Sequence, residues 1–266
     1  EFRRVLFRSD MMKMIDFLPP RTQKPRQTGL TMVMDKGLGP HAVEDLCVTA
    51  APHIDFLKLG FGTSVFTGGL KEKLATYKKY GVNVYVGGTF LEAFIARNKM
   101  ADFHWIMKEF DIHMVEVSDG SYEMGQQRKL EIIRECKEHG YTVISEVGNK
   151  CKDREYTREE WVDSMKAELG AGSSIVIVEA RESGTTGIYN KDGSVNKEMV
   201  DYLVAEVDPS RIMWEAPQKS QQAWLIKTFG INVNLGNIAP TDIVALEALR
   251  NGLRGDTFAQ VLSGHY

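Results

Sequence analysis

Short apolar segments rich in β-branched residues alternate with longer segments of helical periodicity along most of the chain. The longer segments include residues 69–80, 126–139 and 158–169, where charged side chains recur on one side of the helix. Some short segments are apolar at consecutive positions, as in residues 175–178, which is typical of a parallel strand covered on both faces. The pattern predicts eight strands, at residues 30–34, 54–59, 82–86, 114–117, 142–147, 174–178, 212–214 and 231–235.

Eight strand and helix units within 266 residues suit a barrel in which a helix follows each strand, since such barrels typically take roughly 250 residues. An open doubly wound sheet is the alternative, but no glycine-rich dinucleotide-binding turn follows the first predicted strand. We therefore predict an α/β protein with a single (β/α)8 TIM barrel over residues 14–266. Residues 1–13 resemble a cloning tail, because they are arginine-rich and lack the apolar stretch of roughly 7–15 residues that a signal peptide needs.

The amino-acid composition indicates which binding partners and which cellular compartment are expected. The formal net charge is −3, with 33 basic and 36 acidic residues, so no basic excess favours nucleic acid. The three cysteines are too far apart for a paired zinc site, which favours free thiols in a reducing, cytoplasmic setting. No apolar run approaches the ~20 residues of a membrane span, and we expect a soluble protein that does not bind membranes. A homo-oligomer is expected, although no residue pattern defines the number of subunits.

Polar residues follow almost every predicted strand, where barrels of this class carry their active sites. Any one of these residues would be ordinary in a solvated loop. Together, however, carboxylates at the ends of the first, fourth, fifth, sixth and seventh strands would have to pair or bind a ligand if buried at one rim. The carboxylates are Asp35, Glu116, Glu146, Glu179 and Glu215, and the interleaved cations are Lys36, Lys58, Lys150, Arg181 and Lys219.

Two kinds of ligand would suit this rim. Glu116, Glu146 and Glu179 end consecutive strands, so one divalent cation such as Mg²⁺ could bind them; ion pairing with Lys58 or Arg181 explains them equally well. The glycine-rich segments at 60–64 and 87–89 offer backbone N–H groups to oxyanions, although a tight turn accounts for each of them as well.

The strand ends and the C-terminal region contain a series of short segments in a fixed order. They are DKGLGP at 35–40, FLKLGFGTS at 56–64, VYVGGT at 84–89, VEVSDGS at 115–121, SEVGNK at 145–150, VEARESG at 178–184, WEAPQKSQQ at 214–222, VNLGNI at 233–238 and LRNGLRGDTF at 249–258. Taken together and in order, these segments resemble the phosphosulfolactate synthase family, in particular a bacterial, Bacillus-like member. The resemblance extends over residues 15–260, and it is specific because it includes all eight predicted strand ends.

The resemblance implies a lyase that adds sulfite to phosphoenolpyruvate with the help of Mg²⁺ and forms (2R)-phospho-3-sulfolactate. The product would serve coenzyme M or sulfolactate biosynthesis. The family mechanism implies an aci-carboxylate stabilised by the metal, with Glu116, Glu146 and Glu179 as candidate ligands, and a lysine after the fifth strand as the acid. Lys150 matches that lysine, while Asn149 stands where related chains are expected to carry a second one. The expected substrate-binding residues are Lys36, Lys58, Arg181, Ser183, Gly184, Gln218, Lys219 and Asn234.

Two alternatives stay open at this stage. Another barrel enzyme acting on phosphoenolpyruvate or an enolate would share the metal and the lysine without requiring sulfite. A barrel that has lost catalysis and only binds an anionic metabolite would keep the same rim.

Overall fold

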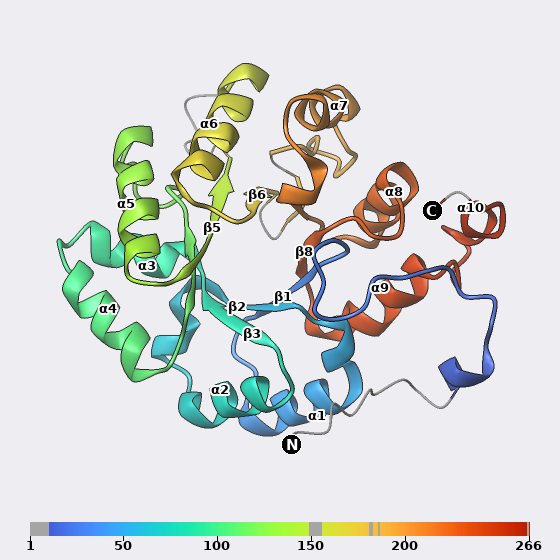
Figure 1. The fold of residues 1–266 in the computed structure, drawn as a ribbon, viewed down its shortest axis with the longest axis horizontal. Coiled ribbons are helices and arrows are strands. Elements are labelled where there is room, and N and C mark those ends of the chain that lie inside the picture. Colours follow the sequence, from blue (N-terminus) through green and yellow to red (C-terminus); the bar gives the residue numbers. More distant parts are fainter. Residues whose placement is uncertain (1–10, 149–155, 181–182, 186, 265) are drawn as a thin grey trace.

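The strands close into a barrel in a computed structural model that describes residues 11–148, 156–180, 183–185, 187–264 and 266. All neighbouring strands pair in parallel and in chain order, and the last strand pairs with the first, so the predicted single (β/α)8 barrel is confirmed (Figure 1). The strands are β1 (Thr31–Asp35), β2 (Phe56–Leu59), β3 (Asn83–Val86), β4 (Met114–Val117), β5 (Thr142–Val147), β6 (Val176–Val178), β7 (Ile212–Glu215) and β8 (Leu235–Ile238).

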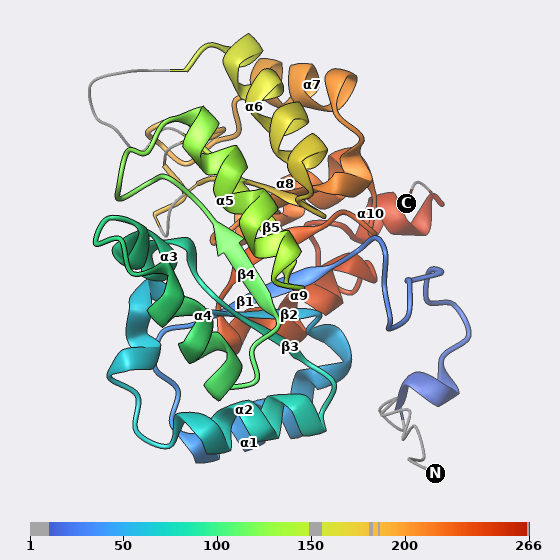
Figure 2. The same ribbon diagram turned by 60° about the vertical axis from the view of Figure 1, so that its left-hand side comes forward.

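Helices surround the strands on every side, as Figures 1 and 2 both show. The three helices predicted above are present with ends shifted by at most two residues, as α2, α5 and α6. The described helices are α1 (Pro40–Ala50), α2 (Leu70–Lys79), α3 (Gly88–Ile95), α4 (Met100–Glu109), α5 (Gln126–Glu138), α6 (Arg158–Ala171), α7 (Lys197–Glu206), α8 (Lys219–Phe229), α9 (Ile243–Arg250) and α10 (Phe258–Leu262).

Each strand is buried on both faces, which explains its consecutive apolar residues. Alternate residues point outward against the helices, as Val33 and Val115 do, and inward into the barrel, as Met32 and Met213 do. A strand enclosed in this way has no solvent face on which polar residues could alternate. The polar side chains that remain on these strands therefore stand out as candidates for function.

The eighth strand is the one element that the sequence pattern misplaced. We predicted residues 231–235, whereas β8 runs from Leu235 to Ile238. Ile231 and Val233 are buried, but their carbonyl groups accept hydrogen bonds from the guanidinium of Arg250, at 2.6 and 2.8 Å. A buried backbone must have its polar groups satisfied, and here a side chain from α9 does so in place of a neighbouring strand.

The N-terminal segment closes the end of the barrel at which the strands begin. Arg21 forms an ion pair with Glu247 of α9 at 3.1 Å, and Arg26 pairs with Asp55, immediately before β2, at 3.0 Å. These buried pairs fill one end of the barrel and leave the opposite end for function. Residues 11–14 form a short 3-10 turn before this segment, and the interpretation of residues 1–13 as a cloning tail stays a prediction.

Two cysteines are described, Cys47 and Cys136, and both are free and buried. Among the described helices, none combines the length and the apolar character that crossing a membrane requires.

Candidate active site

A cavity of about 510 Å³ lies at the C-terminal ends of the strands. Every strand contributes a lining residue that lies within two residues of its C-terminal end, so the barrel itself positions most of the walls. Its lining contains Met34, Lys58, Phe61, Gly87, Gly88, Thr89, Glu116, Gly120, Ser121, Glu146, Glu179, Ser183, Glu215 and Asn237. This is the end of the fold at which barrel enzymes carry out their chemistry.

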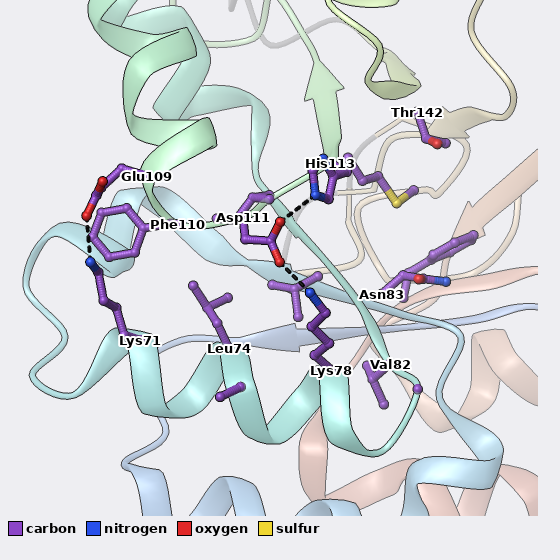
Figure 3. Close-up of a pocket in the computed structure, with 16 residues that line it drawn as sticks. Lys71, Leu74, Lys78, Val82, Asn83, Glu109, Phe110, Asp111, His113 and Thr142 are labelled. Carbon is purple, nitrogen blue, oxygen red and sulfur yellow. Dashed lines mark hydrogen bonds and ion pairs between the residues drawn. The ribbon is translucent and has the colours of Figure 1, made fainter. Parts of the chain in front are cut away.

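A second and larger cavity, of about 620 Å³, lies between α2 and α4 at the opposite end, against the first residues of β2, β3, β4 and β5 (Figure 3). Its charged side chains pair with one another in exposed positions. Lys71 binds Glu109, and Asp111 binds both Lys78 and His113, as the dashed lines show. Exposed pairs of this kind contribute little energy, and barrel enzymes carry their active sites at the other end of the strands, so this cavity is not the candidate active site.

Lys58 lies at the centre of the active-site cavity and is surrounded by carboxylates. Its Nζ is 2.9 Å from Glu116, 3.5 Å from Glu146 and 3.9 Å from Glu215. Glu116 is also held by the backbone N–H of Gly88, which donates to its Oε1 at 2.7 Å. Gly88 is the first residue of α3, and an N-terminal amide of a helix is a favourable partner for an anion.

The buried charges at this end do not balance. Four glutamates line the cavity and Lys58 is the one cationic residue among the described lining residues. Burial alone lowers the pKa of Lys58, but the three carboxylates outweigh it and the net pKa is raised, so the amine stays charged. Burial, reinforced by the nearby carboxylate of Glu146, raises the pKa of Glu215 from 4.5 to about 7 even though Lys58 lowers it. Among the described lining residues, carboxylates therefore outnumber cations four to one.

Close packing positions the carboxylate of Glu179. Gly148 follows β5, and a methyl group built on it would lie 2.5 Å from the Cβ of Glu179. Real side chains do not approach so closely, so only glycine leaves Glu179 room at this position. The neighbouring Glu215 is fixed through its Oε2, which accepts a hydrogen bond from the Ala180 N–H at 2.8 Å.

Buried ionic groups behind the cavity hold the loops that line it. Glu92 of α3 accepts hydrogen bonds from Ser118 and from the backbone N–H groups of Gly120, Ser121 and Tyr122, so one carboxylate organises the whole loop after β4. The sequence pattern did not single out Glu92. Its neighbours are apolar, which makes a lone carboxylate there the one signal that could have indicated a buried partner.

Lys129 of α5 interacts with β5 and with the loop after β4 from the outer face of the barrel. Its Nζ donates to the backbone oxygen of Glu146 at 2.7 Å and forms ion pairs with Asp119 at 3.1 Å and with Glu168 at 2.7 Å. Both Lys129 and Glu168 are fully buried. This network ties the strand that carries Glu146 to the helices outside it.

The loop that carries Lys36 is organised by Asp35. The Oδ1 of Asp35 accepts the N–H groups of Gly37 and Leu38, both at 2.8 Å, while its Oδ2 pairs with Lys73 at 2.8 Å and binds the Tyr77 hydroxyl at 3.0 Å. Asp35 is thus a structural residue whose charge is compensated from α2. Lys36 itself is exposed and does not line the cavity.

The predicted substrate-binding residues are distributed unevenly around the rim. Lys58 and Ser183 line the cavity. Gln218 lies one hydrogen bond away, since its Nε2 donates to the Ser183 oxygen at 2.7 Å, and Gly184 packs against Gln221 behind it. Lys219 is half exposed and pairs with Asp256 at 3.1 Å, a contact that ties the C-terminal segment to the barrel.

The structure does not bring Asn234 to this rim. Asn234 immediately precedes β8, which begins at Leu235, so it lies at the end of the barrel where the strands begin, opposite the cavity. Its side chain is saturated there, accepting from the Leu30 N–H and donating to the carbonyl groups of Ser210 and Ile212, all at 3.0 Å. Lys150 and Arg181 lie outside the described residues, and their roles stay predictions.

The three predicted metal ligands, Glu116, Glu146 and Glu179, are all in the cavity, but Lys58 lies between two of them. Among the described residues, no three His, Cys, Asp or Glu side chains are grouped so that they could hold a metal ion. The donors nevertheless suit Mg²⁺, which prefers hard oxygen ligands and commonly binds one or two carboxylates together with water and substrate oxygens. Four buried carboxylates at one cavity supply oxygen donors of this type.

Phe61, which lines the cavity, and Tyr85, a buried residue of β3 inside the barrel, were given no role from the sequence. Tyr85 on β3 is fully buried, and burial together with the charges of Glu116 and Glu215 raises its pKa well above 10, so its hydroxyl remains protonated. Phe61 lines the mouth with a left-handed backbone, φ 52°, which is rare for a bulky residue. Phe61 lies in the glycine-rich segment at 60–64 that the sequence pattern placed at the rim, whereas Tyr85 lies among apolar strand residues that resemble the core.

Comparison with solved structures agrees with the barrel. A 3-hexulose-6-phosphate synthase superimposes with a TM-score of 0.54 at 13% identity, covering 83% of this chain and 99% of that one. The YdjI aldolase of Escherichia coli K12 gives a TM-score of 0.54 at 11% identity, covering 80% of this chain and 75% of that one. At such low identities these similarities concern the fold alone.

Sequence comparison is far more specific. The family model described as (2R)-phospho-3-sulfolactate synthase (ComA) matches residues 19–256. The chain is 40% identical to the phosphosulfolactate synthase of Methanothermobacter thermautotrophicus, over 94% of this chain and 99% of the relative. It is 38% identical to that of Bacillus subtilis, over 91% and 96%. The resemblance noted at the predicted rim is confirmed, and this chain belongs to the phosphosulfolactate synthase family of enzymes.

Proposed function

We propose that this chain catalyses the addition of sulfite to phosphoenolpyruvate, giving (2R)-phospho-3-sulfolactate. The observation that carries the proposal is a cavity at the strand C-termini whose described lining holds four buried carboxylates and one lysine, in a chain that belongs to this family. In the reaction the sulfur lone pair forms a bond to C3, the C2–C3 π bond opens, and its electrons move into the substrate carboxylate. A proton then adds at C2.

Mg²⁺ would supply a Lewis acid that stabilises the negative charge developing on the substrate carboxylate oxygens. Glu146 and Glu179 are the proposed ligands, with Glu215 beside them. Glu116 was also a candidate ligand, but its two oxygens already interact with the Gly88 N–H and the Lys58 ammonium. We therefore assign Glu116 the role of positioning Lys58.

The chain's own residues would handle the anions and the proton. Lys58 keeps a permanent positive charge within the cavity, and Ser183 offers a hydroxyl at its rim. Lys36 and Lys219, which lie outside the cavity lining, and Arg181 are proposed to attract the two anionic substrates. Lys150 is the proposed acid that delivers the proton to C2, an assignment that rests on its place after β5 in the family motif.

The decisive experiment combines the purified protein with phosphoenolpyruvate, sulfite and Mg²⁺, and follows the carbon skeleton by NMR. A sulfonated product with a single C2 configuration is expected, and EDTA should abolish its formation. Consumption of phosphoenolpyruvate without sulfite would indicate a different enolate chemistry. Binding of phosphoenolpyruvate without any turnover would indicate a barrel that only binds its ligand.

Lys150→Ala tests the proposed acid. Loss of a general acid should lower kcat by a factor on the order of 10²–10⁴ while phosphoenolpyruvate affinity is largely kept. Lys108→Ala is the matched control, because Lys108 is an exposed lysine near the end of α4, outside the cavity lining. An unchanged kcat in Lys150→Ala would remove this lysine from the mechanism.

A further inference from the structure

Asn237 has an unusual backbone for a residue within a strand. It lies inside β8 with φ 55°, in the left-handed region. Such a conformation is uncommon for any residue other than glycine, and asparagine is among the few that tolerate it. Strain of this kind persists when surrounding structure enforces it, and it concentrates at functional sites.

A β-bulge enforces this conformation. Thr31 pairs with Leu235 and Val33 pairs with Ile238, so two steps along β1 match three steps along β8, and β8 carries one additional residue. Gly236 permits the bulge, since a Cβ there would lie 2.9 Å from the Met32 side chain inside the barrel. Bulges of this type redirect a side chain and are common beside active sites.

The bulge directs the Asn237 side chain toward the cavity. Asn237 is 7% exposed and lines the cavity together with Lys58, Glu116 and Glu215. Its Oδ1 is buried and has no hydrogen-bond partner among the residues that the structure describes. A buried polar atom without a partner is unfavourable, and native proteins rarely leave one without a functional reason.

We propose that Asn237 binds the substrate directly, with its side-chain amide donating a hydrogen bond to an anionic oxygen of phosphoenolpyruvate. This inference rests on the proposed function. A turn of the amide about its Cβ–Cγ bond presents the NH₂ group in place of the oxygen, so either face of the amide can meet a ligand. A neutral donor is suited to a cavity that already has surplus carboxylates, where an acidic side chain would repel the substrate.

Asn237→Gly is the test variant, because glycine accepts the left-handed backbone and removes only the amide. Affinity for phosphoenolpyruvate is measured by calorimetry with Mg²⁺ and without sulfite, so that no turnover occurs. The variant should bind about 10- to 100-fold more weakly, as expected for loss of a hydrogen bond to a charged group. Asn237→Asp should weaken binding at least as much, because it loses the donor and adds a negative charge. Asn237→Gly should melt close to the wild-type temperature, so that its weaker binding cannot be ascribed to unfolding.

Asn98→Gly is the matched control, since Asn98 is also left-handed, at φ 54°, but is exposed and outside the cavity lining. It should leave phosphoenolpyruvate affinity unchanged. Wild-type affinity in Asn237→Gly, or in Asn237→Asp, would overturn the role of the amide as a donor while leaving the proposed function intact. Failure of the wild-type protein itself to bind phosphoenolpyruvate would instead refute the proposed substrate.

Discussion

Replacing Glu215 by glutamine should stabilise the protein at alkaline pH, at the expense of activity. Glu215 is fully buried, and its pKa of about 7 lies well above the ordinary 4.5, because of burial and the nearby Glu146. Glutamine removes the charge but can still accept the hydrogen bond that the Ala180 N–H donates to Glu215 at 2.8 Å. The substitution thus removes an unfavourable buried charge with little change of shape.

The magnitude follows from the two pKa values. Unfolded chains release the Glu215 proton near pH 4.5 and folded ones near pH 7, so between these values the folded protein binds more protons and its stability falls as pH rises. At ~1.4 kcal/mol for each tenfold difference in proton affinity, the loss is about 3 kcal/mol above pH 7. Glu215→Gln should recover up to that amount at pH 8 and at most about 1 kcal/mol at pH 5.

Urea unfolding at pH 5 and pH 8, with EDTA present to remove compensating cations, measures this difference. Glu109→Gln is the control, because Glu109 belongs to an exposed ion pair with Lys71, and its loss should change stability by less than about 1 kcal/mol at either pH. An equal gain for Glu215→Gln at both pH values, or a loss at pH 8, would refute the inference that the buried charge of Glu215 is only partly compensated by Lys58.

Two further substitutions test the supports of the cavity. Lys129→Met leaves the buried carboxylate of Glu168 without its ammonium partner and should lower the free energy of unfolding by about 3–5 kcal/mol. Adding Glu168→Leu should restore much of this loss, as measured by urea unfolding. A double variant no more stable than Lys129→Met would contradict the inference that the unpaired carboxylate causes the loss. Gly148→Ala should displace Glu179 and lower kcat/KM at least about tenfold. Gly170→Ala is the control, because Gly170 lies in α6 with open space around it, and this variant should leave kcat/KM unchanged. Equal kcat/KM values for the two alanine variants would show that Gly148 does not position Glu179.

The sequence pattern was reliable where burial is uniform and local. Seven strands were placed within one or two residues of their observed bounds, because a parallel strand enclosed on both faces needs consecutive apolar residues. It failed at β8, where Ile231 and Val233 are equally apolar and buried, but Arg250 satisfies their carbonyl groups. That interaction joins residues distant in sequence, so no local pattern could have revealed it.

The candidate active site, like the fold, was predictable from the sequence only in part. The chain order of Glu116, Glu146 and Glu179 at successive strand ends sufficed to predict that they meet at one rim, because parallel strands place their C-terminal ends together. The pattern could not say that Lys58 pairs with Glu116, nor that Glu215 carries an unbalanced charge. Ion pairing between these side chains depends on distances of a few ångströms across the barrel. Those distances are set only when the eight strands close into a barrel.

What the sequence by itself determined was the barrel, the end that carries the chemistry and, through its ordered rim motifs, the family. Periodicity and strand order are properties of the chain, so reading them needs no coordinates. What only the tertiary structure decided was the use of each polar side chain. Asp35 supports a loop, Asn234 closes the far end, and the bulge in β8 turns Asn237 into the cavity. Those roles depend on burial and on neighbours from other strands, which exist only once the eight strands have closed on one another.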